Sequence, residues 1–318
     1  MKKILIFIVF VLTPISLQAV AEQVSYSLQG NDGKDIIYYL ISRDGTHYKD
    51  LLVLIQGSDC KSVINNRTMI ENFGATFPDN DILLVEKSGL DRRIGKNGVE
   101  PDELTCPQEY MQGDSPSKRV KDYLAVLHQL KNRYRHIVLL GGSEGAIITN
   151  MIASDADFIT AAISMNGGGR FFIDDVIQSI RRESPEEMTD EAVNNFKAFA
   201  EKAKKQQLPA GMTVSKHGTN WWHEVLSIDN QKMIQSSKTP LLVIQTMSDH
   251  NVDAAGALQM MAAIDNPMVS FKTYEGLDHF FKDSDGNDHA SAIIKDIKSW
   301  YQLQVHGRKQ GHEKRDVP

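Results

Sequence analysis

Short apolar runs rich in β-forming residues alternate with longer amphipathic segments along nearly the whole chain. This alternation is typical of βαβ units around a mostly parallel sheet, so it predicts an α/β fold. Residues 24–28 and 36–42 should open the sheet as an antiparallel pair, because a turn cluster of Gly and Asx residues lies between them. Six more strands are predicted, which gives eight in total: 51–56, 82–86, 136–140, 160–165, 241–246 and 269–274.

Apolar residues at helical spacing predict flanking helices over 117–133, 143–153, 254–264 and 290–303, the first capped by Ser117. The segment 170–238 breaks this rhythm with two charged helical stretches and the pair Trp221-Trp222. We predict that it is a helical cap insertion over the functional site, within a single domain that spans 22–304. A surface subdomain without a role in substrate binding is the alternative, since insertions concentrate in loops. The polar segment 305–318 is expected to be a flexible tail.

The first 21 residues have the pattern of a signal peptide. Two lysines precede an apolar run over 4–12, and Ala19-Val20-Ala21 forms a small-residue cleavage site. The run is shorter than the ~20 apolar residues that span a bilayer. We therefore expect a mature chain from Glu22, in the periplasm or secreted, with no stable membrane span; an uncleaved anchor is the alternative.

The net charge and the cysteine content indicate which partners and which covalent links to expect. Without Lys2 and Lys3 the chain has 33 basic and 41 acidic side chains, a net charge of −8, which disfavours a nucleic-acid partner. Cys60 and Cys106 are the two cysteines of the chain. Export would place them in an oxidising compartment, so a disulfide between them is the preferred interpretation, with free buried thiols as the alternative.

The pentapeptide Gly141-Gly142-Ser143-Glu144-Gly145 matches the pattern G-x-S-x-G. A predicted strand precedes it and a predicted helix follows, which is the context of a nucleophile elbow. Glycines are needed where the sharp turn leaves no room for a β-carbon, and the turn lifts the serine hydroxyl clear of the sheet. Ser143 is therefore the candidate nucleophile.

With this motif the sequence resembles the α/β-hydrolase superfamily over nearly the whole mature chain. In that family the acid follows a late strand and a histidine lies in a loop after the last strand. The resemblance implies Asp249 as the acid, after the run Leu241 to Ser248, and His279 as the base, within Glu275-Gly276-Leu277-Asp278-His279-Phe280. Asp253 is a substitute acid on the same loop, whereas His250 and Asp278 have the wrong place in the order.

These roles imply acyl transfer through an acyl-enzyme, with two backbone N–H donors for the oxyanion. One donor should be Glu144, directly after the nucleophile, and the other should come from the loop Gln56-Gly57-Ser58-Asp59. This loop resembles the His-Gly oxyanion loop of the family with Gln in place of His, so either Ser58 or Asp59 could donate. The disulfide predicted at Cys60 starts in the same loop.

We expect hydrolysis of an ester or thioester in a small-molecule substrate, contacted by Gln56, Gly57, Trp221 and Trp222. A serine peptidase is the alternative within the same chemistry, and a non-catalytic binding protein of the same fold is the alternative from another class. No cofactor and no metal are expected. The acidic hexapeptide 283–288 lacks the downstream Glu of a calcium loop, and we interpret it as a solvated turn.

Overall fold

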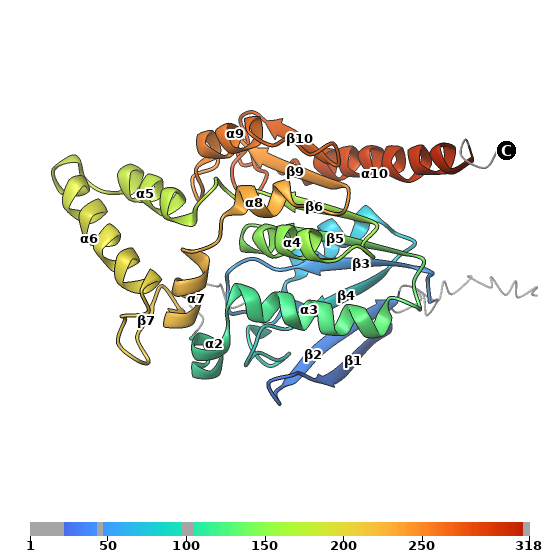
Figure 1. The fold of residues 1–318 in the computed structure, drawn as a ribbon, viewed down its shortest axis with the longest axis horizontal. Coiled ribbons are helices and arrows are strands. Elements are labelled where there is room, and N and C mark those ends of the chain that lie inside the picture. Colours follow the sequence, from blue (N-terminus) through green and yellow to red (C-terminus); the bar gives the residue numbers. More distant parts are fainter. Residues whose placement is uncertain (1–21, 43–46, 97–104, 314–318) are drawn as a thin grey trace, which may run out of the picture.

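One eight-stranded sheet lies at the centre of the protein (Figure 1). The computed structural model describes residues 22–42, 47–96 and 105–313, so the predicted signal peptide lies outside the described residues. All eight predicted strands are present. Their bounds are β1 (Glu22–Gln29), β2 (Asp35–Ser42), β3 (Asp50–Ile55), β4 (Asp81–Val85), β5 (His136–Gly142), β6 (Ala161–Met165), β9 (Leu241–Thr246) and β10 (Val269–Tyr274). Strands β9 and β10 have the predicted bounds, and the ends of the others are shifted by at most two residues.

The strand order is β1-β2-β4-β3-β5-β6-β9-β10. The pairs β1–β2 and β2–β4 are antiparallel, and every other pair is parallel. The predicted α/β class with a mostly parallel sheet is therefore confirmed. Because β3, β5, β6, β9 and β10 are parallel neighbours, the loops that follow them meet at one edge of the sheet.

Both faces of the sheet are covered, which explains the unbroken apolar runs in its central strands. In β3, Leu51, Val53 and Ile55 pack into the core on one face, while Leu52 and Leu54 pack into the core on the other. All five side chains have 1% exposure or less. This is the two-residue alternation of a strand whose two sides are equally buried.

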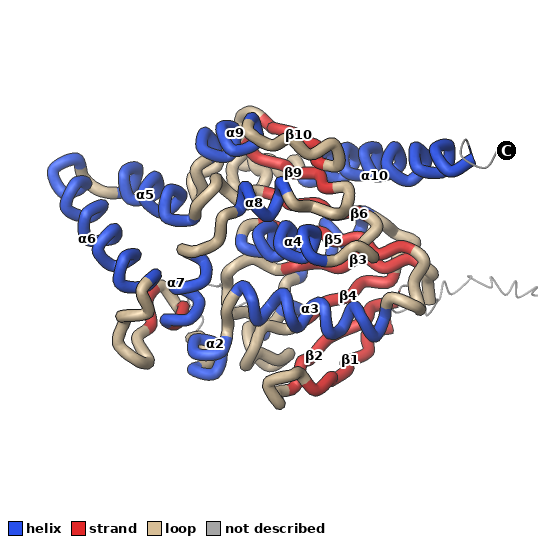
Figure 2. The backbone as a smooth tube through the Cα atoms, in the orientation of Figure 1, coloured by secondary structure: helices blue, strands red, loops and turns tan. Residues whose placement is uncertain are grey.

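Helices form a layer on each face (Figure 2). The helix bounds are α1 (Arg67–Asn72), α2 (Gln108–Gly113), α3 (Pro116–Leu130), α4 (Glu144–Asp155), α5 (Phe172–Glu183), α6 (Glu186–Lys204), α7 (Thr219–Val225), α8 (Asn230–Gln235), α9 (Ala254–Ala262) and α10 (Ala290–Glu313). The core on one face of the sheet includes residues of α3, α4, α8 and α9, and the core on the other face includes residues of α10 together with partly buried residues of α1. None of the described helices combines the length and the hydropathy needed to cross a membrane.

The segment predicted as a cap, 170–238, connects β6 to β9. Its helices α5 and α6 extend away from the sheet on the left of Figure 1. A short hairpin of β7 (Thr213–Val214) and β8 (His217–Gly218), which the sequence pattern did not predict, leads into α7. Trp221 and Trp222 of α7 lie at the centre of a separate apolar cluster with residues of α5 and α6. In contrast, α8 packs on α4, where Asn230 accepts a hydrogen bond from Asn150 at 2.8 Å.

Several helix ends differ from the prediction, and two of the differences have a physical explanation. Helix α3 begins at Pro116, and its cap is Ser115, whose hydroxyl accepts from the Lys118 N–H; the predicted cap, Ser117, instead donates its hydroxyl to Glu224 of α7. A proline at the first helical position is favoured, because its missing N–H would have no partner there. Helix α10 continues to Glu313, so the start of the predicted flexible tail is helical. Half of the residues over 304–313 are good helix formers, and the two glycines among them only weaken a helix.

The predicted disulfide between Cys60 and Cys106 is present. Cys60 belongs to the loop that follows β3, and both half-cystines are buried in a small cluster with Leu90 and Tyr110. The bridge closes a loop of 46 residues. It therefore ties the edge of the sheet that carries the loops to the segment leading into α2.

Replacing both cysteines, as Cys60→Ser with Cys106→Ser, should lower the free energy of unfolding by up to about 4 kcal/mol, because the unfolded chain regains the entropy of the closed loop. Urea denaturation followed by circular dichroism measures this difference. Wild-type protein unfolded in a strong reductant is the control and should resemble the double variant. Equal stability of the wild type with and without reductant would contradict the prediction.

Candidate active site

Ser143 lies at the sharp turn between β5 and α4, as the motif predicts. Its backbone has φ 57° and ψ −127°, a region that non-glycine residues seldom occupy. The turn is held from outside, because the Ser143 N–H donates to the carbonyl of Met165 at the end of β6, at 2.9 Å. The serine is thus placed at the carboxyl edge of the sheet, where it lines two cavities.

The two outer glycines of the motif are required by close packing. A β-carbon on Gly145 would lie 2.1 Å from the carbonyl oxygen of Ile55 at the end of β3. A β-carbon on Gly141 would lie 2.2 Å from the carbonyl oxygen of Gly145. Any side chain at either position would therefore push α4 away from the sheet and move Ser143.

Asp249 follows β9, and His279 lies in the loop that follows β10. The distance between His279 Nδ1 and Asp249 Oδ2 is 2.7 Å, and the two residues are only 9% and 2% exposed. The other carboxylate oxygen, Oδ1, accepts from the N–H groups of Asn251 and Val252, at 2.7 and 3.2 Å. Because Nδ1 must carry a proton to donate to the carboxylate, Nε2 is left as the acceptor of the neutral ring.

Ser143 and His279 line the same cavity, which has a volume of about 690 Å³. No hydrogen bond joins the serine hydroxyl to the imidazole among the described residues; the ring bonds to Asp249. Catalytic hydrogen bonds are commonly long before a substrate binds. The structure thus gathers the three predicted residues at one edge of the sheet.

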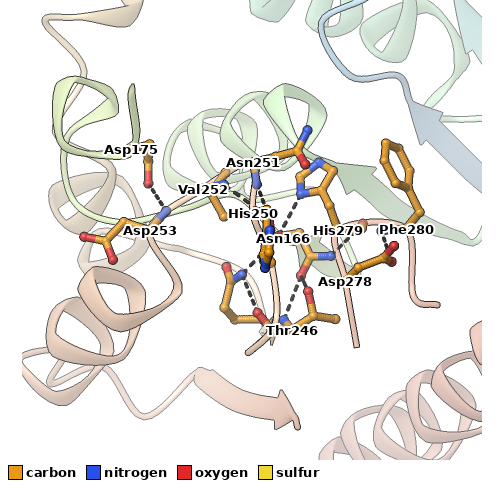
Figure 3. A network of polar contacts seen from close by, with 12 residues as sticks. Asn166, Asp175, Thr246, His250, Asn251, Val252, Asp253, Asp278, His279 and Phe280 are labelled. Atoms are coloured by element: carbon orange, nitrogen blue, oxygen red, sulfur yellow. Dashed lines mark hydrogen bonds and ion pairs between the residues drawn. The ribbon is translucent and has the colours of Figure 1, made fainter. Parts of the chain in front are cut away.

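The alternative acid and base residues make other contacts (Figure 3). The Asp253 carboxylate caps α9 by accepting from the Gly256 N–H at 3.0 Å. The Asp278 carboxylate accepts from two N–H groups of its own turn, those of Phe280 and Lys282. His250 is exposed. Of the described carboxylates, Asp249 is the one bonded to the His279 ring.

Two further residues support this pair, and the sequence did not single them out. Asn166, at φ 51° after β6, donates to the carbonyl of His279 at 3.0 Å and accepts from the Thr246 N–H at 2.9 Å (Figure 3). Arg182 of α5 donates to the carbonyls of Asp249 and His250. An asparagine after a strand is a weak signal for a left-handed turn residue. Arg182 gives no signal, because it is one of several charges on its helix.

The predicted oxyanion loop lies beside Ser143. Gly57, Ser58 and Asp59 line the larger cavity. Gln56 does not line either cavity, contrary to its predicted contact with substrate: it is 2% exposed, and its amide donates to Asp59 and to the Lys61 carbonyl. The glutamine is therefore a brace inside the loop, since its buried amide must find its partners within the protein.

The side chain of Glu144, the residue after the nucleophile, is buried beneath the site. Arg119 Nη1 lies 3.2 Å from its carboxylate, and Trp221 Nε1 donates to it at 2.9 Å. Burial alone would raise the pKa of Glu144, but the nearby cations Arg119 and Lys87 lower this pKa to about 2. The carboxylate is therefore charged, and it links the elbow to the cap.

The second cavity at Ser143 has a volume of about 340 Å³ and is mainly apolar. Trp221 and Trp222, which were predicted to contact substrate, both line it. Asp175 is a buried acid in its wall and accepts from the N–H groups of Gly169 and Asp253; burial raises the pKa of Asp175 to about 7. The apolar members of the wall are Ile147, Phe172, Val176, Trp221, Trp222, Val225, Ile228 and Val252.

Residues 121–266 match the family described as "BAAT / Acyl-CoA thioester hydrolase C terminal". The match covers just under half of the chain and includes Ser143 and Asp249, while His279 lies beyond it. No curated protein matches the chain in sequence.

Solved structures of hydrolases have the same fold. Est1E from Butyrivibrio proteoclasticus has a TM-score of 0.54 at 15% identity, over 89% of this chain and 99% of Est1E. A cold-adapted esterase from an Arctic intertidal metagenomic library has a TM-score of 0.52 at 10% identity, over 89% and 95% of the two chains. A puromycin-hydrolyzing peptidase from Mycobacterium tuberculosis has a TM-score of 0.54 at 13% identity, over 91% of this chain and 40% of the peptidase. Together with the sheet order, these similarities show that the chain has the α/β-hydrolase fold.

Proposed function

We propose that the protein is a serine hydrolase that cleaves a carboxylic ester or thioester, with Ser143 as nucleophile, His279 as general base and Asp249 as its partner. The observation that carries the proposal is the 2.7 Å pair of Asp249 and His279 beside a cavity that the elbow serine also lines. An acid, an imidazole and a strained serine gathered at one sheet edge form the arrangement that nucleophilic acyl transfer requires.

The reaction follows from the proton positions. His279 Nε2 takes the proton of Ser143 Oγ as this oxygen attacks the substrate carbonyl carbon, and the carboxylate of Asp249 stabilises the imidazolium. The tetrahedral intermediate collapses when the bond to the leaving oxygen or sulfur breaks and Nε2 returns the proton to that atom. Water then attacks the acyl-enzyme with Nε2 again as base, which releases the acid and restores the serine.

The position of His279 suggests which cavity binds the leaving group of the substrate and which binds its acyl group. The leaving group must lie within hydrogen-bond reach of Nε2, so it belongs in the 690 Å³ cavity, which His279 lines. His279 is not among the described residues that line the 340 Å³ cavity. The acyl group therefore belongs there, against Trp221 and Trp222, and we propose an apolar acyl chain or aromatic acyl group.

The similarities favour the same chemistry. The matching family is named for acyl-CoA thioester hydrolases, and a structure of Est1E is described with ferulic acid bound. A peptidase is the second candidate, because the puromycin-hydrolyzing peptidase has the same fold. We also propose that the protein works outside the cytoplasm, which the Cys60–Cys106 disulfide supports.

Ser143→Ala should abolish labelling by a fluorophosphonate probe and reduce turnover of p-nitrophenyl esters by about a million-fold, because no other group can form the acyl-enzyme. In-gel fluorescence and steady-state kinetics give the two readouts. Ser215→Ala, on another serine that lines the smaller cavity, is the control and should label normally. Labelling that persists in Ser143→Ala would reject this nucleophile, and a wild type that hydrolyses p-nitroanilides faster than matched esters would indicate the peptidase.

His279→Ala should reduce kcat by about a million-fold, and Asp249→Asn by about 10,000-fold, because the first removes the base and the second removes the charge that orients it. Pre-steady-state kinetics with p-nitrophenyl acetate measure both losses. Asp253→Asn is the matched control, since it changes an acid of the same loop that caps α9, and it should retain nearly full activity. A loss below tenfold in His279→Ala would remove that residue from the mechanism.

Val176→Trp should narrow the smaller cavity and lower kcat/KM for p-nitrophenyl octanoate by at least ~10-fold relative to the acetate, because the long acyl chain loses its space. Met69→Trp makes a similar change in the larger cavity and is the matched control. Met69→Trp should lower kcat/KM for acetyl esters with bulky leaving groups relative to acetyl esters with small ones. It should leave the preference between octanoyl and acetyl esters unchanged. The opposite pattern in the two variants would reverse the assignment of the cavities.

A further inference from the structure

A buried lysine lies behind the loop beside the proposed nucleophile. Lys87 follows β4, is 3% exposed, and donates from Nζ to the carbonyls of Gly57 and Asp59. The carbonyl between them, that of Ser58, accepts from the hydroxyl of Tyr110 at 3.2 Å. Three consecutive carbonyls of the loop are therefore held by buried side chains.

The charge of Lys87 is not explained by an ion pair. Among the ion pairs of the described residues, none includes the ammonium group of Lys87. Burial and the positive charge of Arg119 lower the pKa of Lys87, while the charges of Glu144, Asp59 and Asp114 oppose that shift. A buried cation without a direct counter-ion is costly, and an apolar side chain would fill the same space without that cost. The burial of Lys87 therefore indicates a functional role for its side chain.

The peptide unit between Gly57 and Ser58 faces the proposed nucleophile. A β-carbon on Gly57 would lie 3.3 Å from Ser143 Cβ and 3.8 Å from Ser143 Oγ, so this backbone lies against the serine. In a trans peptide the N–H points away from the carbonyl, hence the Ser58 N–H points away from Lys87. Ser58 lines both cavities, and among the described residues no acceptor takes its N–H.

We propose that Lys87 is a positioning residue for catalysis: its ammonium group, bonded to the Gly57 carbonyl, fixes and polarises the peptide unit whose N–H, that of Ser58, stabilises the oxyanion. This proposal rests on the proposed function and selects Ser58 over Asp59 as the donor from the loop. A cation on the carbonyl draws electron density from the amide, which strengthens the N–H as a donor. Lys87 is buried, so little solvent screens its positive charge, which therefore also favours the developing oxyanion directly.

The test compares Lys87→Met with Lys87→Arg. The neutral variant should lose about 10- to 100-fold in kcat and in the rate of fluorophosphonate labelling, with little change in KM, because the donor acts on the transition state. Lys87→Arg keeps the charge and should recover most of the activity. Lys238→Met is the control for the loss of a lysine that donates to a backbone carbonyl, here that of Asp155, because Lys238 is exposed and precedes β9, at the opposite edge of the sheet from the site.

An effect on KM alone, or equal activities of Lys87→Met and wild type, would overturn the proposal while leaving the serine hydrolase intact. A wild type that fails to label at Ser143 would instead refute the proposed function itself. Loss of activity in Lys87→Arg equal to that in Lys87→Met would also count against the role of the charge.

A measurement on the wild type keeps the proposal testable if the variants do not fold. When a fluorophosphonate phosphonylates Ser143, its phosphoryl oxygen occupies the oxyanion site. In amide NMR spectra the Ser58 proton should then move downfield, as expected for a strengthened hydrogen bond, and the Asp59 proton should move less. A larger downfield shift at Asp59 would assign the donor to Asp59 and overturn the proposal.

Discussion

The close packing of α4 against the end of β3 is the contact on which the site depends. Gly145 lies so near the Ile55 carbonyl that only a hydrogen fits between them. This contact fixes the first turn of the helix, and with it the strained backbone of Ser143. Strain of this kind persists only where the surroundings determine the conformation. Here the surroundings are the buried central strands of the sheet and the Met165 carbonyl, so the serine occupies a rigid position.

The electrostatics beneath the serine extend this rigidity to its neighbours. Arg119 forms an ion pair with Glu144 and also donates to the carbonyl of Gln56 at 2.5 Å. Trp221 donates to the same glutamate and stacks on His217, with ring centroids 3.7 Å apart. One buried charge pair thus links the elbow, the loop after β3 and the cap. Loss of one partner would leave an uncompensated buried charge, so the three parts are coupled.

The acid and the imidazole are held in a comparable way, by backbone groups instead of charges. The N–H groups of Asn251 and Val252 hold one oxygen of Asp249, which directs the other toward His279. Asn166 holds the loop of His279 to the end of β9, and Arg182 attaches the cap to the loop of Asp249. The segment predicted as a cap therefore supports the site, because Arg182 of its helix α5 holds the loop that carries the acid.

The eight strands and the turn at Ser143 could be predicted from local periodicity and a short motif. The candidates Asp249 and His279 came from the order of acid and histidine in the superfamily that the sequence resembles. The structure was needed to show that Asp253 caps a helix, that Ser115 and not Ser117 caps α3, and that Gln56 braces its loop away from the cavities. It also revealed Lys87, Asn166 and Arg182, whose partners lie far away in the chain. A hydrogen bond across a sheet edge leaves no periodic trace in the sequence, since it depends on which loops the strand order brings together.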